Sequence, residues 1–326
     1  MTEALLSVRD LTVGVQRRRT LQPIVRDVSF DVGNGEAVGI VGESGSGKTL
    51  TMLSVMGLLP TPPLRVGAGE VRFGDRDLIR MRERDLRRIR GRDLAMIYQD
   101  PMTSLNPLMR IGEQIAEVMT AHGVAKDDAR TRAREALAHV GIPDPDRTAR
   151  AYPHEFSGGM RQRVMIAAAL ALNPQLLIAD EPTTALDVTI QQQILALVRS
   201  LQAEHGMAIV WITHDLGVVA RLVERVIVMY AGRIIEVAPT RRLFRSPEHP
   251  YTAGLLASLP DPSDRERRPL AQIPGSPPDP AGVPEGCPFR TRCRQAIERC
   301  AHEMPPLTDR GGGQAAACWV PPEEWT

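Results

Sequence analysis

The sequence predicts an α/β fold with a mainly parallel sheet, and three observations support this prediction. Short apolar runs of strand length recur along the chain, at residues 37–41, 176–179, 208–213 and 226–229. Helical spacing of apolar residues separates two of these runs, over residues 188–202. The first run leads directly into a glycine-rich loop, and a helical pattern begins at Lys48.

The remaining elements follow in chain order from local patterns. Val, Ile and Leu cluster as in short strands at residues 5–15 and 24–32, and a Gly-Asn-Gly-Glu turn follows at residues 33–36. Residues 104–172 indicate helices punctuated by prolines, so we expect an inserted helical subdomain there. After about residue 236, Pro, Arg and Gly become frequent and strand patterns fade. We therefore expect one domain over residues 1–240 and an extension over residues 241–326.

Composition and charge restrict the function classes. A formal net charge of +1 gives the chain no overall positive potential that would attract nucleic acid. The arginine-rich stretch Arg80 to Arg92 is interleaved with Met81, Leu86 and Ile89, which favours a solvated helix face over an anionic partner. The start lacks the plan of a signal peptide, and the apolar run Val164 to Leu172 is too short to cross a bilayer. We expect a soluble chain inside the cell, with any membrane role supplied by other subunits.

The glycine-rich loop after residues 37–41 has the pattern G-x-x-x-x-G-K-[ST]. Such loops wrap phosphate oxygens with backbone N–H groups, while the lysine reaches the β- and γ-phosphates and the hydroxyl holds Mg²⁺. Lys48 is one of only two lysines in the chain, and a compact ammonium suits this task. The residues expected to bind ATP here are Gly42, Glu43, Ser44, Gly45, Ser46, Gly47, Lys48 and Thr49, with Thr49 also a Mg²⁺ ligand.

Two carboxylate residues directly follow the strand predicted at residues 176–179. Ligands in α/β sheets bind at the carboxyl ends of strands, so Asp180 is placed to hold Mg²⁺, usually through water. Glu181 is one residue further and is free to align the attacking water or accept its proton. We expect Asp180 to anchor the metal and Glu181 to act in hydrolysis.

A second anion site is predicted where Ser157, Gly158 and Gly159 precede a strongly helical stretch. Serine is a good N-cap, and a helix N-terminus with bare glycines attracts anions. One chain does not need two such sites for one γ-phosphate. We therefore expect two ATPase chains to face each other, each completing the site of its partner.

These motifs, in this order, make the chain resemble the nucleotide-binding subunits of ABC transporters. The resemblance also rests on Gln99 in Tyr-Gln-Asp-Pro, on Ala185-Leu186-Asp187 and on His214 in Thr-His-Asp. It implies a P-loop NTPase fold with an antiparallel β subdomain, an inserted α-helical subdomain and a small Cys-rich extension. It also implies that Gln99 contacts Mg²⁺ or the attacking water, that His214 contacts the γ-phosphate, and that Asp187 lies at the interface between ATPases.

The resemblance implies partners as well. The segment Pro101 to Pro107 would meet two transmembrane permease subunits at the cytoplasmic face of the membrane, and an extracytoplasmic binding protein would deliver the solute. The signature ends in Met160 rather than Gln, which favours a non-identical second ATPase. The position that usually stacks an aromatic ring on adenine is Val15, so we do not expect this chain to supply such a ring.

The tail narrows the resemblance to oligopeptide and dipeptide importer ATPases, through His249-Pro250-Tyr251-Thr252 and four cysteines. The cysteines follow C-x5-C-x6-C-x17-C, whereas zinc sites usually begin with closer pairs, so the spacing leaves an iron–sulfur cluster, zinc and free thiols open. Similar importers imply a structural four-iron four-sulfur (4Fe-4S) cluster. Its ligands here would be Cys287, Cys293, Cys300 and Cys318.

We therefore expect an ATPase that powers peptide import. The same machinery could carry another small solute, such as a nickel chelate. A soluble ATPase acting on nucleic acid is disfavoured, because about 107 residues without heptads separate Thr49 from Ser157. A regulatory module without turnover is disfavoured because Glu181 and His214 are both in place.

Overall fold

The computed structural model describes residues 4–18, 20–100, 104–184, 186–259 and 272–325. The chain divides into two compact units. The first contains the residues up to Val32, Ala37–Ile79 and the chain from Ile212 onward, and the second contains Gly33–Glu36 and Arg80–Trp211. Residue 240 lies inside the first unit, so the division into residues 1–240 and 241–326 stays a prediction.

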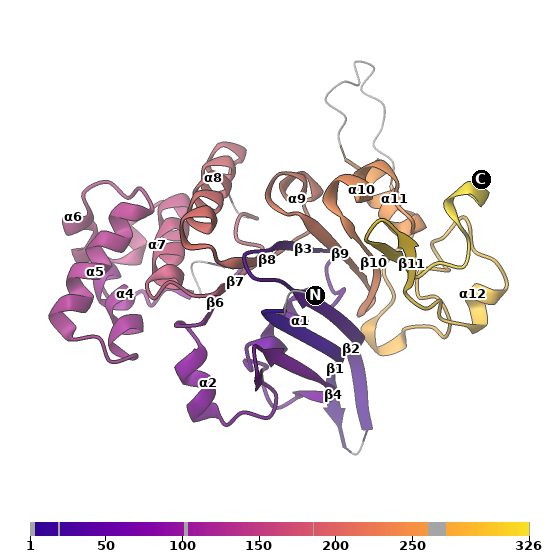
Figure 1. The fold of residues 1–326 in the computed structure, drawn as a ribbon, viewed down its shortest axis with the longest axis horizontal. Helices are drawn as coiled ribbons and strands as arrows, with labels where there is room; N and C mark the ends of the chain where they lie inside the picture. Colours follow the sequence, from indigo (N-terminus) through magenta and orange to yellow (C-terminus); the bar gives the residue numbers. More distant parts are fainter. Residues whose placement is uncertain (1–3, 19, 101–103, 185, 260–271, 326) are drawn as a thin grey trace. The chain divides into compact units, whose positions relative to one another are not determined.

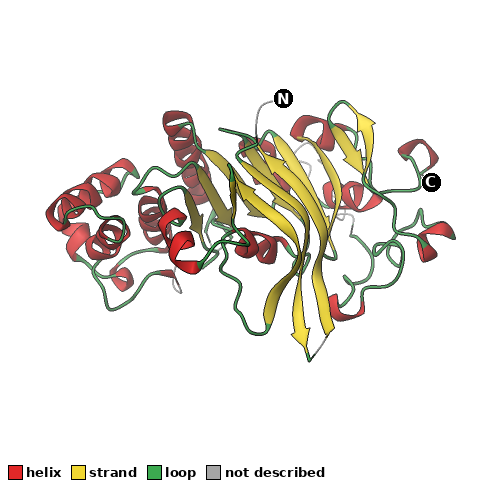
Figure 2. Cartoon of the chain, turned by 60° about the horizontal axis from the view of Figure 1, so that its bottom comes forward, coloured by secondary structure: helices red, strands yellow, loops and turns green. Residues whose placement is uncertain are grey.

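An antiparallel sheet forms part of the first unit. Its strand order is β2 (Thr20–Val32), β1 (Leu6–Arg17), β4 (Leu64–Phe73) and β5 (Arg76–Asp77). The long strands of this sheet are among those drawn in yellow in Figure 2. Leu6 pairs with Val32 and Val13 with Val25, and all four side chains are buried. Cross-strand pairs of this kind stabilise the sheet and fix its register.

The other sheet of this unit contains β3 (Ala37–Val41), which is buried at every position. Strand β3 pairs in parallel with β9 (Arg225–Tyr230), and β9 continues into the antiparallel strand β10 (Arg233–Pro239). Two further strands follow on the β10 side, β12 (Gln314–Ala316) and then β11 (Thr308–Gly311). The expectation that strands fade after residue 236 is therefore wrong, because the tail returns to the sheet.

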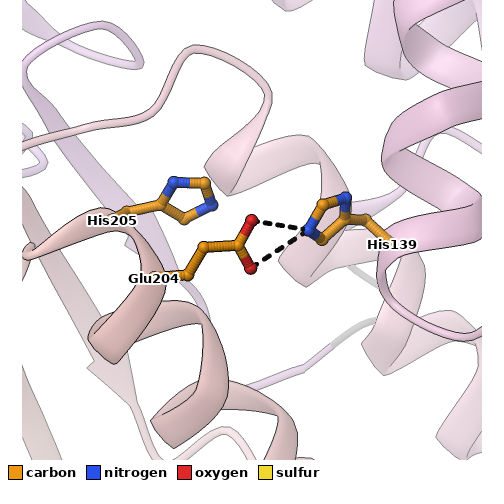
Figure 3. Close-up of side chains that lie close together, drawn as sticks. All are labelled: His139, Glu204 and His205. Atoms are coloured by element: carbon orange, nitrogen blue, oxygen red, sulfur yellow. Dashed lines mark hydrogen bonds and ion pairs between the residues drawn. The ribbon is translucent and has the colours of Figure 1, made fainter.

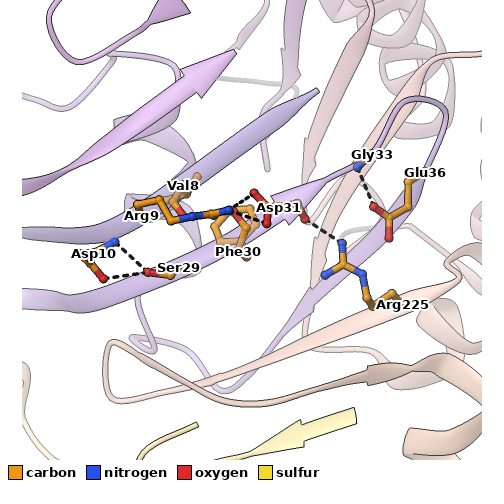
Figure 4. A network of polar contacts seen from close by, with 9 residues as sticks. All are labelled: Val8, Arg9, Asp10, Ser29, Phe30, Asp31, Gly33, Glu36 and Arg225. Atoms are coloured by element: carbon orange, nitrogen blue, oxygen red, sulfur yellow. Dashed lines mark hydrogen bonds and ion pairs between the residues drawn. The ribbon is translucent and has the colours of Figure 1, made fainter. Parts of the chain in front are cut away.

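The two sheets of the first unit are tied together by Arg225. Its guanidinium donates to the backbone oxygen of Asp31 at 2.7 Å, while the Asp31 carboxylate pairs with Arg9 at 2.7 Å (Figure 4). The helices of this unit are short: α1 (Lys48–Val55), α9 (Leu216–Leu222), α10 (Thr240–Arg245), α11 (Pro250–Ala257), α12 (Arg299–His302), and the 3₁₀ turns Pro280–Gly282 and Pro322–Glu324.

The second unit combines strands with a group of helices. Strand β7 (Leu176–Asp180) lies between β6 (Leu94–Ile97) and β8 (Ala208–Thr213), and β6 and β7 are parallel. Figure 1 shows helices α4 to α7 gathered in one group. The helices are α2 (Glu83–Ile89), α4 (Ile111–Thr120), α5 (Lys126–His139), α6 (Pro145–Arg150), α7 (Gly158–Leu170) and α8 (Val188–His205), with a 3₁₀ turn at Pro153–Glu155.

The packing confirms the predicted α/β class and several predicted helix faces. Ile111, Ile115 and Met119 are buried together on α4. On α2, Leu86 and Ile89 are buried while the neighbouring arginines are exposed, as expected for a solvated helix face. Over the described ranges, the helices are each too short or too polar to cross a membrane.

Candidate nucleotide-binding site

The phosphate loop, residues 42–49, joins β3 to α1 in a conformation that requires glycine. Gly42 has φ +155°, and a Cβ there would lie 2.2 Å from the backbone oxygen of Met229. Gly47 is the N-cap residue of α1 and has φ +97°, in the left-handed region. The loop therefore turns tightly against β9 and directs the chain into α1, as a phosphate cradle requires.

Lys48 lies within this cradle rather than in solvent. Its side chain is 5% exposed, and its ammonium donates to the backbone oxygens of Gly42 at 2.8 Å and Glu43 at 3.0 Å. The loop itself thus holds the only side-chain cation that the phosphate-loop motif contains. A charge fixed in this way is positioned before a phosphate binds, which reduces the cost of ordering it.

The strand-end carboxylates lie in the second unit. Asp180 is the last residue of β7 and is buried, whereas Glu181 has φ +45°, a left-handed conformation that is uncommon for a non-glycine residue. The Glu181 Oε2 atom accepts from Gln99 Nε2 at 3.4 Å and from Thr184 Oγ1 at 2.9 Å. The structure therefore brings together the two side chains, Gln99 and Glu181, that we predicted to face the attacking water. Strained backbone of this kind is concentrated at functional sites.

The predicted N-cap at Ser157 is confirmed. Its Oγ accepts from the backbone N–H of Met160, and α7 begins at Gly158. A Cβ on Gly159 would lie 2.7 Å from Ile190 Cγ2, so this glycine permits close packing of α7 on α8. Asp187 caps α8 by accepting from the Ile190 N–H at 3.0 Å. Ala185 and residues 101–103 of the predicted membrane-facing segment lie outside the described residues.

His214 follows β8, in the first unit together with the phosphate loop. It is exposed, and the next residue, Asp215, caps α9 through the N–H groups of Gly217 and Val218. Gln99, Asp180, Glu181, Ser157 and Asp187 all belong to the second unit.

Sequence reasoning missed the partners of the phosphate loop from the C-terminal extension. Arg292 pairs with Glu43 through two N–H···O contacts at 2.7 and 3.0 Å, and Tyr251 accepts from the Glu43 N–H at 2.9 Å. A cavity of about 250 Å³ also adjoins the loop, lined among others by Ile24, Tyr230 and the prolines at 277, 278 and 280. Arg292 and Tyr251 both lie in the tail segments that indicate the resemblance to peptide importer ATPases. No local sequence pattern links either residue to Glu43.

A buried polar network supports this part of the extension. His249 is 1% exposed, and its Nδ1 accepts from the Tyr251 N–H at 3.0 Å. The Glu236 carboxylate accepts from the backbone N–H groups of Glu248 and His249 and from Gln314 Nε2. Burial raises the pKa of Glu236 and lowers the pKa of His249 to about 3, so this histidine is neutral in the folded chain.

The His249 shift predicts a loss of stability in acid. The pKa of a histidine in the unfolded chain is about 6.5. Below that pH the unfolded state binds a proton that His249 in the folded state does not bind until about pH 3. We expect His249 to lower the free energy of unfolding by roughly 2–3 kcal/mol between pH 7.5 and 4.5. In His249→Asn, the side chain keeps an acceptor for the Tyr251 N–H but does not titrate. Urea unfolding followed by circular dichroism should show a smaller acid loss in this variant; equal losses would contradict the prediction.

The four cysteines of the extension carry free thiols and lie near one another. The Cys287 N–H donates to the Cys300 backbone oxygen at 2.9 Å. Burial, together with the neighbouring thiols, raises the pKa of Cys287 to about 12 and that of Cys293 to about 11. Thiols in such surroundings are protonated at neutral pH, and a bound metal would be needed to hold them as thiolates.

His139, Glu204 and His205 form a separate group of potential ligands at the C-terminal ends of α5 and α8 (Figure 3). All three are exposed, and the Glu204 carboxylate is bonded to His139 Nε2 at 3.1 and 3.2 Å. This arrangement is that of a surface ion pair, and we assign no ion to it.

The glycine cradle with its buried lysine, the carboxylates at the end of β7 and the capped helix α7 define an ATPase of the ATP-binding cassette class. Residues 25–184 match the model of the ABC transporter family, and residues 235–300 match that of the oligopeptide/dipeptide transporter C-terminal region. The ATP-binding cassette MJ0796, solved as a dimer in a post-hydrolysis state with ADP and Pi, has a TM-score of 0.64. It is 30% identical to this chain, covering 72% of this chain and 99% of that structure.

Curated relatives span nearly the whole chain. The probable peptide ABC transporter ATP-binding protein y4tR of Sinorhizobium fredii is 50% identical, over 97% of this chain and 95% of the relative. The oligopeptide transport ATP-binding protein OppD of Bacillus subtilis is 49% identical, over 93% of this chain and 85% of the relative. The chain therefore belongs to the ABC transporter family of ATP-binding, ATP-hydrolysing subunits, in its oligopeptide and dipeptide branch.

Proposed function

We propose that this chain binds and hydrolyses ATP to power the import of dipeptides or oligopeptides across the cytoplasmic membrane. The observation that carries the proposal is the joint presence of the ATPase cassette and the extension typical of peptide transporters, in one chain related throughout to peptide transport subunits. In this role, residues 42–49 grip the triphosphate, and Thr49, Asp180 and Gln99 hold Mg²⁺. Glu181 activates the attacking water, and His214 contacts the γ-phosphate.

Two ATPase chains form the working unit in this proposal. Ser157 caps α7, and Gly158 and Gly159, the first residues of that helix, complete its N-terminal anion site, while Asp187 caps α8. Val188, which follows Asp187, is 71% exposed, as an apolar residue at a subunit interface would be before assembly. Met160 in the signature supports a non-identical partner, so we propose a heterodimer.

The same proposal places the chain at the cytoplasmic face of the membrane, bound to two permease subunits that receive solute from an extracytoplasmic binding protein. The segment around Gln99 supports this placement, because Tyr98, just before Gln99, is 40% exposed and Leu108, just after Pro107, is 85% exposed. Exposed apolar side chains on both sides of one segment suit a contact with another protein. Nucleic acid has no part in this function.

Transport assays test the proposal directly. The complete transporter, with this chain and its neighbouring subunits, is reconstituted in vesicles. ATP is enclosed inside the vesicles, and labelled peptides are added outside. We expect uptake of dipeptides or oligopeptides that depends on ATP. Uptake of a nickel chelate with no uptake of any peptide would overturn the peptide assignment, while leaving the ATPase assignment intact.

We further propose that the extension holds a structural 4Fe-4S cluster through Cys287, Cys293, Cys300 and Cys318. The thiols are close enough to shift one another's pKa, which fits a shared group. The sequence spacing C-x5-C-x6-C-x17-C lacks the close cysteine pair with which zinc sites usually begin, and this supports an iron–sulfur cluster over zinc.

Chain purified without oxygen is expected to be brown and to contain iron and acid-labile sulfide in equal amounts. The Cys300→Ser variant is expected to lose both, because Cys300 is a buried ligand that hydroxyl oxygen replaces poorly. Metal analysis and the visible spectrum provide the measurement. Stoichiometric zinc, or chain without metal in both samples, would contradict the cluster.

A further inference from the structure

The side chain of Glu43, in the phosphate loop, is held by an arginine from the far end of the sequence. Both carboxylate oxygens of Glu43 pair with Arg292, Oε2 with Nη1 at 2.7 Å and Oε1 with Nη2 at 3.0 Å. The Arg292 side chain is 4% exposed and that of Glu43 is 25% exposed. A two-point pair sheltered from water is stronger and more directional than an exposed ion pair.

Arg292 is itself fixed on every side. Its Nε donates to the Pro274 backbone oxygen at 2.8 Å, and its Nη1 also contacts the Tyr230 hydroxyl at 3.3 Å. The guanidinium lies 5.8 and 5.9 Å from the ring centres of Tyr230 and Phe289. An arginine side chain is not deprotonated in proteins, so the cation is permanent. Glu43 therefore meets a rigid partner, not a mobile surface side chain.

The backbone of Glu43 is also held from two directions. Its N–H donates to the hydroxyl oxygen of Tyr251, a fully buried residue, at 2.9 Å. Its carbonyl oxygen accepts from the Lys48 ammonium at 3.0 Å. Burial raises the pKa of Tyr251, so this hydroxyl stays neutral. Glu43, near the start of the loop, is thus held through its side chain, its backbone N–H group and its backbone carbonyl oxygen.

We propose that Arg292, with Tyr251, is a positioning residue for the phosphate loop. By holding Glu43, the pair keeps the loop in the shape that binds triphosphate and neutralises a carboxylate next to the bound phosphates. This inference rests on the proposed ATP binding and extends it, because it makes the affinity for ATP depend on the C-terminal extension. If only a fraction of molecules has the competent loop, the apparent dissociation constant rises by the inverse of that fraction.

The test measures KM and kcat for ATP hydrolysis by the assembled transporter and asks which of the two each substitution changes. For Arg292→Ala we expect KM to rise about five- to tenfold while kcat at saturating ATP stays within about twofold, because bound nucleotide restores the loop. For Tyr251→Phe, which keeps the buried ring, we expect a rise of about two- to fourfold. Arg241→Ala, an exposed arginine on α10, is the matched control and should leave KM unchanged.

A purely structural role would give a different result, namely fewer active molecules, hence a lower kcat with an unchanged KM. Such a result for Arg292→Ala would overturn the inference. If Arg292→Ala does not fold, Arg292→Lys replaces it, since lysine keeps the charge but lacks the two-point fork, and KM should rise about two- to fivefold.

A double-mutant cycle identifies Glu43 as the partner. If Arg292 acts through Glu43, the Arg292→Ala change should raise KM by less than about twofold in a Glu43→Gln background. Full additivity of the two effects would exclude this pair as the route. Failure of the wild-type chain to hydrolyse ATP at all would instead overturn the proposed function, so the two failures are distinguishable.

Discussion

Replacing Lys48 by alanine is expected to reduce ATP hydrolysis by at least about 10²- to 10³-fold. The ammonium is buried in the loop and already oriented by the backbone oxygens of Gly42 and Glu43. Its removal leaves the β- and γ-phosphates without the one cation that the loop contributes, and weakens binding of ATP as well. The measurement is phosphate release by the assembled transporter, together with binding of a fluorescent ATP analogue to the full chain.

The chain provides an unusually clean control for this experiment. Lys126 is its only other lysine, and it lies exposed at the start of α5. Lys126→Ala should leave turnover and nucleotide binding unchanged, because the substitution removes the same charge far from any phosphate-binding motif in the sequence. Full turnover in Lys48→Ala would contradict the role of the loop and the function built on it.

Replacing Glu181 by glutamine is expected to slow hydrolysis by about 10²- to 10³-fold while ATP affinity changes little. The amide keeps the size of the carboxylate but cannot accept the proton of the attacking water. Because Gln99 Nε2 and Thr184 Oγ1 both donate to Oε2, the substituted side chain can still be held by its remaining amide oxygen. The variant should therefore accumulate bound, unhydrolysed ATP.

Single-turnover hydrolysis and the ratio of ATP to ADP in trapped complexes measure this effect. Glu204→Gln serves as a control, since Glu204 is an exposed acid at the end of α8 and is not part of any nucleotide-binding motif. A wild-type rate in Glu181→Gln would show that another group activates the water. Loss of ATP binding in this variant would show that Glu181 acts in binding instead.

The elements that carry the motifs could be predicted from the sequence because their signals are local. The buried run at residues 37–41 is β3, and the serine before a helical stretch is the N-cap of α7. Asp180, predicted to lie at the carboxyl end of a strand, is the last residue of β7. In each case a few neighbouring residues determine the outcome, through apolar continuity or a capping side chain. The chemical roles of the site residues stay predictions.

Elements that depend on distant partners could not be predicted. Strand β4 contains Gly67 and Gly69, which interrupt the alternation of apolar residues, and it forms because β1 supplies its hydrogen bonds. Gly69 has φ +107°, and a Cβ there would lie 2.6 Å from Leu11 Cα. Strands β11 and β12 are short and polar, and β12 exists as a strand because β10 offers it an edge. The partnership of Glu43 with Arg292 has no local signal for the same reason.

The link between Glu43 and Arg292 has a consequence for synthesis of the chain on the ribosome. The two residues are 249 positions apart, so the nascent polypeptide carries a finished glycine loop long before its anchoring guanidinium exists. At about 5–20 residues per second, translation needs roughly a quarter of a minute to a minute to bridge that gap. During this interval the loop has its own lysine but not its contact with Arg292, and synthesis of Arg292 and of β12 then completes both the nucleotide cradle and the pairing at the edge of β10.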